Sequence, residues 1–122
     1  MKRILVVDDE PEVLTVTCLM LKASGFEVLA ATGRDEALVF FEDFPSGLDL
    51  VITDVEMPGT NGVELAAAIH SICPSQKIVI CSGNLGGLAD KGIHIPANLP
   101  TISKPFRLPK LIAFIQQVIA SG

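Results

Sequence analysis

Three short apolar runs constrain the fold more than any other feature of this sequence. They span residues 4–7, 50–53 and 78–81, and apolar and polar side chains do not alternate within them. A strand with one face in water shows that alternation, whereas a strand covered on both faces reads as a continuous apolar run. Strands of the second kind occur in parallel sheets with helices on both sides. The runs therefore predict an α/β fold built on a parallel sheet.

The segments between these runs support the same architecture. We expect helices over residues 12–23, 34–43 and 63–72, a second strand over 26–31, and a final helix with one apolar face. That face comprises Leu108, Leu111, Ile112, Ile115, Val118 and Ile119. Parallel neighbouring strands need a crossover that covers one face of the sheet. We therefore predict a doubly wound, five-stranded parallel sheet with helices on both faces. For its strand order we adopt 2-1-3-4-5, one of the common orders of doubly wound folds, which the apolar runs do not themselves determine.

The fourth connection departs from this regular pattern. Gly86, Gly87 and Gly92 lie within one short stretch, and each glycine inside a helix costs about 1 kcal/mol relative to alanine. We therefore expect the fourth helix to be weak or irregular. The stretch lacks the GxxxxGK[ST] pattern of a phosphate-binding loop, so its glycines indicate flexibility.

The composition limits the classes of function. The chain has 122 residues, the length of one domain, and its 49% hydrophobic and 19% charged residues exclude intrinsic disorder. A net charge of −5 without a basic cluster excludes nucleic acid and anionic membrane surfaces as partners. The three cysteines lie in apolar runs and form no CxxC pair, which predicts buried thiols in a reducing compartment. Without a signal peptide or membrane span, we expect a cytoplasmic protein.

Acidic residues follow two of the expected strands. Asp8 and Asp9 end the first strand, and Asp54 ends the third. Carboxyl ends of parallel strands share one edge, so these carboxylates converge if the two strands are neighbours. Unit charges about 4 Å apart repel by several kcal/mol at a surface-like dielectric. Protonation or a hard divalent cation such as Mg²⁺ would relieve this repulsion, although Asp8 and Asp9 could instead simply cap the first helix.

A hydroxyl and an ammonium group follow the remaining strands at this edge. Ser82 ends the fourth strand, and Lys104 follows the fifth. Facing a metal ion and a carboxylate, these two groups would form a receptor for a tetrahedral anion. The pattern predicts Asp54 as the nucleophile of a phosphoryl transfer, with Mg²⁺ and Lys104 neutralising charge on the equatorial oxygens.

Together these features resemble the receiver domain of two-component response regulators, the CheY-like family. The matching motifs are VVDDE at 6–10, DVEMPG at 54–59, NG at 61–62, SG at 82–83 and KPF at 104–106. The resemblance covers nearly the whole chain and identifies residues 1–122 as one receiver domain. It implies that Asp54 accepts a phosphoryl group from a histidine kinase or a phosphotransfer protein. The domain would then switch a surface that binds a downstream protein target.

The resemblance also implies roles for individual residues. The Mg²⁺ ligands would be Asp9, Asp54 and the backbone carbonyl of Glu56, with Asp8 acting through a water molecule. Ser82 and Lys104 would bind the phosphoryl oxygens. Water would later attack the acyl phosphate, so the domain would catalyse only its own phosphorylation and dephosphorylation.

One position departs from the family pattern and affects the expected switch. The switch residues would be Ser82 and the residue three positions before the lysine, which is usually aromatic and is here Thr101. A threonine cannot report phosphorylation by swinging a ring. We predict instead that phosphorylation reorders residues 83–95 in an order–disorder transition. The resemblance also places Glu56 and Asn84 at positions that tune the lifetime of the acyl phosphate in receivers. Glu56 could either position the attacking water or repel it, and so either shorten or lengthen that lifetime.

Two other functions are alternatives. A pseudo-receiver would bind proteins independently of phosphorylation, which Thr101 favours and the complete set of acids and Lys104 disfavours. A phosphohydrolase would use Glu56 as an acid, but residues 57–59 and the short chain leave no substrate pocket. Flavin binding fails because the acids at 8–10 would repel a phosphate at the first loop. The chain ends directly after the last expected helix, so we expect either a stand-alone receiver or one excised from a longer protein.

Overall fold

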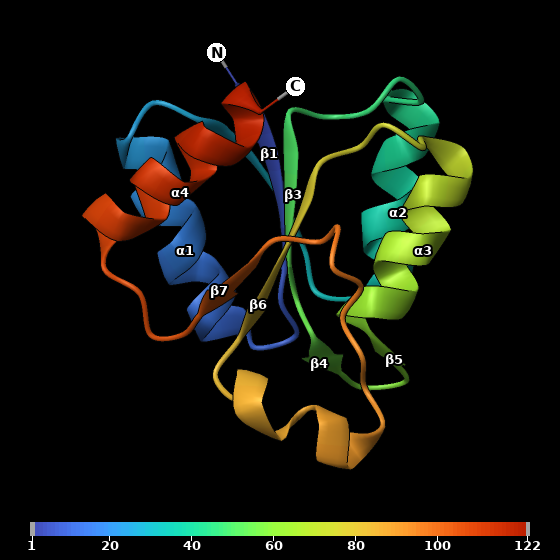
Figure 1. The fold of residues 1–122 in the computed structure, drawn as a ribbon. Coiled ribbons are helices and arrows are strands. Elements are labelled where there is room, and N and C mark those ends of the chain that lie inside the picture. Colours follow the sequence, from blue (N-terminus) through green and yellow to red (C-terminus); the bar gives the residue numbers. More distant parts are fainter. Residues whose placement is uncertain (1, 122) are drawn as a thin grey trace.

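The computed structural model describes residues 2–121 as a three-layer α/β structure (Figure 1). Across these residues the main sheet has five parallel strands in the order β2-β1-β3-β6-β7, which confirms the predicted order. The strands, in that spatial order, are β2 (Glu27–Ala31), β1 (Arg3–Val7), β3 (Leu50–Asp54), β6 (Ile78–Ser82) and β7 (Thr101–Ser103). The predicted parallel α/β architecture is therefore confirmed.

Helices cover both faces of this sheet, as predicted. The helices are α1 (Pro11–Ala23), α2 (Arg34–Asp43), α3 (Gly62–Ile72) and α4 (Leu108–Ala120). Helices α1 and α4 lie on one face, and α2 and α3 lie on the other (Figure 1). The observed bounds agree with the expected ones within one or two residues. Differences of this size are usual, since periodicity defines the ends of a helix less well than its middle.

Strand β1 shows why the apolar runs do not alternate. Ile4 and Val6 belong to the core beneath α1 and α4, whereas Leu5 and Val7 belong to the core beneath α2 and α3. All four side chains are at most 3% exposed. Burying one such side chain contributes about 1.5–3 kcal/mol. Both faces of the strand therefore need apolar residues. Polar side chains can be accommodated only beyond the end of the strand, at the edge of the sheet.

The fourth connection contains two single turns of 3₁₀ helix, η1 (Leu85–Gly87) and η2 (Ala89–Lys91), in place of an α-helix. This confirms the expectation of a weak fourth helix. Leu88, between the two turns, is 3% exposed and anchors the segment in the core. The segment lies at the edge where the parallel strands end (Figure 1).

A short hairpin at the same edge was not expected from the sequence, which indicated only a turn. Strands β4 (Glu56–Met57) and β5 (Thr60–Asn61) pair antiparallel around Gly59, whose φ is +78°. The side chain of Asn61 then accepts a hydrogen bond of 2.9 Å from the backbone N–H of Glu64 and so caps α3. The hairpin fixes the chain that directly follows Asp54.

Two further expectations concern buried thiols and long apolar helices. The cysteines at positions 18, 73 and 81 are buried and free, as expected for core residues. Among the described residues, no helix has the length and apolar character to cross a membrane.

Candidate functional site

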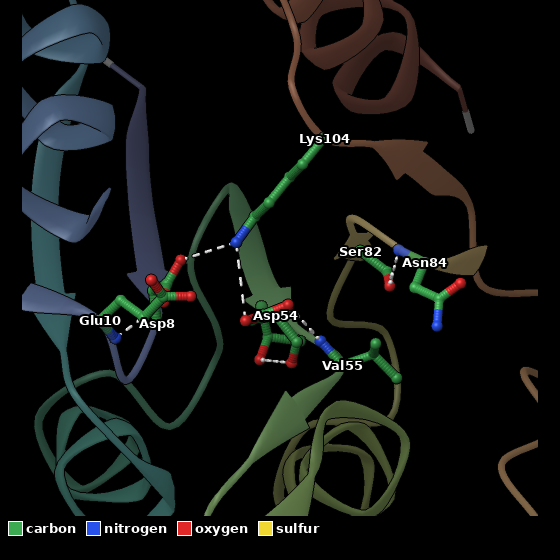
Figure 2. Close-up of polar contacts among 8 residues, drawn as sticks. Asp8, Glu10, Asp54, Val55, Ser82, Asn84 and Lys104 are labelled. Carbon is green, nitrogen blue, oxygen red and sulfur yellow. Dashed lines mark hydrogen bonds and ion pairs between the residues drawn. The ribbon is translucent and has the colours of Figure 1, made fainter. Parts of the chain in front are cut away.

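Four of the predicted site residues meet where the parallel strands end. Asp8 follows β1, Asp54 ends β3, Ser82 ends β6, and Lys104 follows β7 (Figure 2). Strands β1 and β3 are neighbours in register, with Val7 opposite Thr53, so Asp8 and Asp54 emerge side by side. The sheet order thus brings together side chains that are far apart in the sequence.

Lys104 bridges two of the acids. Its Nζ donates a hydrogen bond of 2.9 Å to Asp8 Oδ2 and lies 3.6 Å from Asp54 Oδ2 (Figure 2). Burial lowers the pKa of Lys104, but the hydrogen bond to Asp8 and the charge of Asp54 outweigh this effect, so its pKa is raised overall. The backbone N–H of Lys104 also donates to the carbonyl of Ser82, which holds the end of β7 against β6. The lysine is therefore a fixed positive charge between the carboxylates.

Asp54 lies at the centre of the site in a partly buried position. Burial raises the pKa of its carboxyl group more than the charge of Lys104 lowers it, and the neighbouring charge of Asp8 raises it further. Its Oδ1 accepts a hydrogen bond of 3.0 Å from the backbone N–H of Val55 (Figure 2). Cys81 pairs with Asp54 across the strands, but burial raises the pKa of that thiol to about 12. Burial therefore favours the neutral form of this thiol.

The acid cluster contains a residue that the sequence analysis did not select. Carboxylate oxygens of Asp8, Glu10 and Asp54 lie within 4.8 Å of one another. Glu10 belongs to this cluster because its backbone N–H donates a hydrogen bond of 3.0 Å to Asp8 Oδ1. This bond turns the chain back towards the site. The three successive acids at 8–10 were the feature of the sequence that could have indicated Glu10 as a member of the cluster. Asp9 is less exposed than Glu10 and lines the same pocket as Asp54.

A pocket of about 380 Å³ opens onto these groups. Its lining residues are Asp9, Glu10, Asp54, Glu56, Ser82, Gly83, Asn84 and Lys104. A hollow at this place agrees with the expectation that ligands of an open parallel sheet bind at its carboxyl edge, at the topological switch point. The Oγ of Ser82 accepts a hydrogen bond of 3.0 Å from the backbone N–H of Asn84 (Figure 2). Thr101 lies apart from this pocket, exposed on the edge strand β7 and opposite Ile80.

An apolar groove of about 630 Å³ adjoins the pocket. Val13, Val16 and Met20 of α1 line one side of it, and Pro105 and Phe106 line the other. The groove lies next to the acidic pocket, since Gly83 and Lys104 line both hollows. Val16 in this wall is 56% exposed.

The family follows from comparison with known proteins. Residues 4–116 match the family described as the response regulator receiver domain. The chain therefore belongs to this family, and the predicted resemblance is confirmed.

Curated relatives include both response regulators and sensor kinases. The two-component response regulator-like protein PRR37 of Oryza sativa subsp. indica is 32% identical over 84 residues, which are 67% of this chain and 11% of that protein. The CAI-1 autoinducer sensor kinase/phosphatase CqsS of Vibrio cholerae is 39% identical over 94 residues, 77% of this chain and 13% of that protein. This chain thus spans about a tenth of the length of both relatives. The response regulator receiver protein CpdR of Brucella abortus is 28% identical over 122 residues, the whole of both chains.

Solved structures share the fold. The response regulator TrrA of Thermotoga maritima, solved in complex with Mg²⁺-BeF, has a TM-score of 0.81 and 33% identity over 97% of this chain and 99% of that one. A CheY-like receiver domain protein of Methanospirillum hungatei has a TM-score of 0.84 and 28% identity over 98% of this chain and 94% of that one. Receiver domains therefore share this sheet and its covering helices.

Proposed function

We propose that the whole chain is one phosphoacceptor receiver domain, in which Asp54 takes a phosphoryl group from the phosphohistidine of a kinase or phosphotransfer protein. The observation that carries the proposal is the position of Lys104, 3.6 Å from Asp54 and hydrogen-bonded to Asp8. An oxygen of Asp54 attacks the phosphorus, the phosphorus–nitrogen bond breaks, and the imidazole leaves and takes up a proton. Such transfers depend mostly on positioning and on neutralising charge.

The acids at this edge fit Mg²⁺. The facing atoms of Asp8, Glu10 and Asp54 are all carboxylate oxygens, the ligands that hard divalent cations prefer. Lys104 offers one positive charge to this set, so a second cation is favourable. Membership of the receiver family suggests Asp9, Asp54 and the backbone carbonyl of Glu56 as the ligands, with Asp8 acting through water, and the first three residues line the pocket. Bound there, Mg²⁺ would neutralise charge on the phosphoryl oxygens.

Lys104 and Ser82 bind the oxygens of the transferred group. Lys104 can give up part of its contact with Asp8, since a phosphoryl group on Asp54 places new negative charge beside it. The Oγ of Ser82 already accepts a hydrogen bond from the Asn84 N–H, which leaves its own hydrogen free to donate. Water later attacks the phosphorus, releases inorganic phosphate and restores the Asp54 carboxylate.

The partner that brings the phosphoryl group must cover the mouth of the pocket. The apolar groove beside α1 lies next to the pocket, with Gly83 and Lys104 in the lining of both, so we assign it to a helix of the phosphohistidine donor. A downstream protein target would read the changed surface after transfer. Free, buried thiols suit the reducing cytoplasm, where we place the protein.

A second candidate is a pseudo-receiver, which would bind its partner independently of phosphorylation. The observation in its favour is Thr101, a small exposed side chain on the edge strand β7. It offers no ring that could carry a signal from Ser82 to the surface.

Incubation with acetyl phosphate and Mg²⁺ tests these functions. We expect intact-mass analysis to find one added phosphoryl group on the wild type and none on Asp54→Asn. Asp35→Asn, an exposed acid on α2, is the matched control and should load normally. A wild type that never gains mass would overturn the proposal in favour of a pseudo-receiver. Repeated turnover of organic phosphates would instead indicate a phosphohydrolase.

A further inference from the structure

The wall of the acidic pocket carries more negative than positive charge. Asp9, Glu10, Asp54 and Glu56 all line it, with Lys104 as the basic residue among the lining side chains. Lys104 already pairs with Asp8 and lies near Asp54. An anionic phosphodonor that approaches the pocket therefore meets acids that this lysine does not neutralise.

One of these acids is paired by a lysine from outside the pocket. Glu56 Oε2 lies 2.7 Å from the Nζ of Lys91, which is the last residue of η2. Glu56 lies two positions after Asp54, at the start of the β4–β5 hairpin. The pair joins that hairpin to the irregular fourth connection, across 35 positions of sequence.

Local hydrogen bonds hold the backbone around Lys91 in this structure, and its side chain is exposed. The backbone N–H groups of Lys91 and Ile93 both donate to the carbonyl of Leu88, which is anchored in the core at 3% exposure. Gly92, with a φ of +74°, closes the turn in a left-handed conformation. In this conformation the ammonium group is presented towards Glu56.

We propose that Lys91 is a positioning residue of the phosphoryl-transfer site, which holds the Glu56 carboxylate at the outer wall of the pocket and cancels its charge towards incoming phosphodonors. The proposal rests on the phosphoacceptor function of Asp54. Without Lys91, Glu56 would add an unpaired negative charge at the mouth and slow the approach of an anion. Exposed ion pairs have small energies, so the expected change in rate is about 1.5- to 5-fold.

The test measures the rate of loading from two small donors. Acetyl phosphate is a dianion at neutral pH, whereas phosphoramidate carries a protonated amine and a smaller net charge. We expect Lys91→Met to slow loading from acetyl phosphate about 1.5- to 5-fold at low ionic strength. The effect should shrink in high salt and with phosphoramidate, because both reduce the electrostatic contribution. Lys91→Arg, which keeps the charge, should load like the wild type.

The second arm asks whether Lys91 acts through Glu56. In a Glu56→Gln background, Lys91→Met should have no effect on the loading rate, because the charge that it cancels is gone. Lys22→Met, an exposed lysine near the far end of α1, controls for the loss of a positive charge elsewhere. A slowing that persists in Glu56→Gln, or that is equal for both donors and insensitive to salt, would show a merely structural role and overturn the inference. If the wild type is phosphorylated and Lys91→Met is phosphorylated at the same rate, the inference about Lys91 alone is overturned. If the wild type is not phosphorylated at all, the phosphoacceptor function is overturned as well.

Discussion

Lys104 donates its hydrogen bond of 2.9 Å to Asp8, a residue 96 positions earlier in the chain, although Asp54 is also within 3.6 Å. Asp8 is the more buried of the two acids, with a side chain 6% exposed against 12% for Asp54. A buried carboxylate that loses its partner suffers the cost of desolvation without compensation. The lysine therefore has a structural task at Asp8 besides its proposed role in phosphoryl transfer.

Removing this lysine should destabilise the protein. In Lys104→Met, the Asp8 carboxylate loses its charged partner and retains the backbone hydrogen bond from Glu10, while the acids of the cluster face one another without the charge of the lysine. We expect the free energy of unfolding to fall by about 1–3 kcal/mol in urea denaturation at neutral pH without Mg²⁺. Lys22→Met should be nearly neutral. Equal stability of Lys104→Met and the wild type would mean that the bridge contributes nothing to folding.

The stability of the wild type should also depend on the ionisation of Asp54. Burial raises the pKa of this carboxyl group above its ordinary value of 3.8 in the folded protein. The folded state therefore holds the proton more tightly, and stability is lost as pH rises from the unfolded pKa through the folded one. We expect Asp54→Asn to be more stable than the wild type at neutral pH without divalent cations, with a difference that shrinks below pH 4. Denaturation across pH measures this, and an advantage that grows towards acid pH would contradict it.

The two acids next to Asp8 should contribute unequally to Mg²⁺ binding. Asp9 is partly buried and lines the pocket beside Asp54, whereas Glu10 is exposed and its charge is screened by water. We expect Asp9→Asn to weaken Mg²⁺ binding by about tenfold or more, which corresponds to about 1.4 kcal/mol. Glu10→Gln should weaken it by only about twofold. Titration calorimetry compares the two variants, and a larger loss in Glu10→Gln would move the ligand assignment from Asp9 to Glu10.

The parallel sheet could be predicted because burial imposes a pattern on the sequence, whereas its strand order was adopted from the common orders of doubly wound folds. Continuous apolar runs such as 4–7 require cover on both faces, and this requirement implies the crossovers. The same reasoning places Asp8 and Asp54 at one edge before any coordinates are known. The glycines at 86 and 87 likewise predicted the irregular fourth connection, since they weaken any helix there.

Contacts between loops were beyond prediction. The two-residue strands β4 and β5 are too short to show a periodicity, so the hairpin read only as a turn. The pair between Glu56 and Lys91 depends on how two loops fold over the edge of the sheet, and no sequence pattern relates the two residues. Glu10 entered the acid cluster through a local backbone hydrogen bond that its position alone did not indicate.

The apolar groove should discriminate between large and small phosphodonors. Val16→Asp places a charge in the wall of the groove, where a helix of the protein donor would pack. We expect phosphotransfer from a phosphohistidine protein to slow by about tenfold, with unchanged loading from acetyl phosphate. Val39→Asp, on an exposed valine of α2 with 54% exposure, is the matched control. Equal transfer to both variants would exclude the groove as the docking site.

Phosphorylation should change the dynamics of residues 83–95. This segment holds two single turns of 3₁₀ helix and several glycines, and the backbone hydrogen bonds of Gly87, Lys91, Gly92 and Ile93 all go to carbonyls within residues 84–89. Such segments open at low free energy. Asn84, within this segment, and Glu56, which pairs with Lys91, line the same pocket as Asp54, so new charge on Asp54 can shift the order of the segment.

We expect hydrogen exchange of the amides in 83–95 to change several-fold when Mg²⁺ and beryllofluoride occupy the site, while the amides of β1 do not change. Asp54→Asn, which lacks the acceptor carboxylate, should show the same exchange with and without the mimic. Unchanged exchange in a wild type that binds the mimic would exclude the order–disorder switch. The search for an output surface would then move to the exposed edge of β7 around Thr101, because this strand is joined to Ser82 through β6.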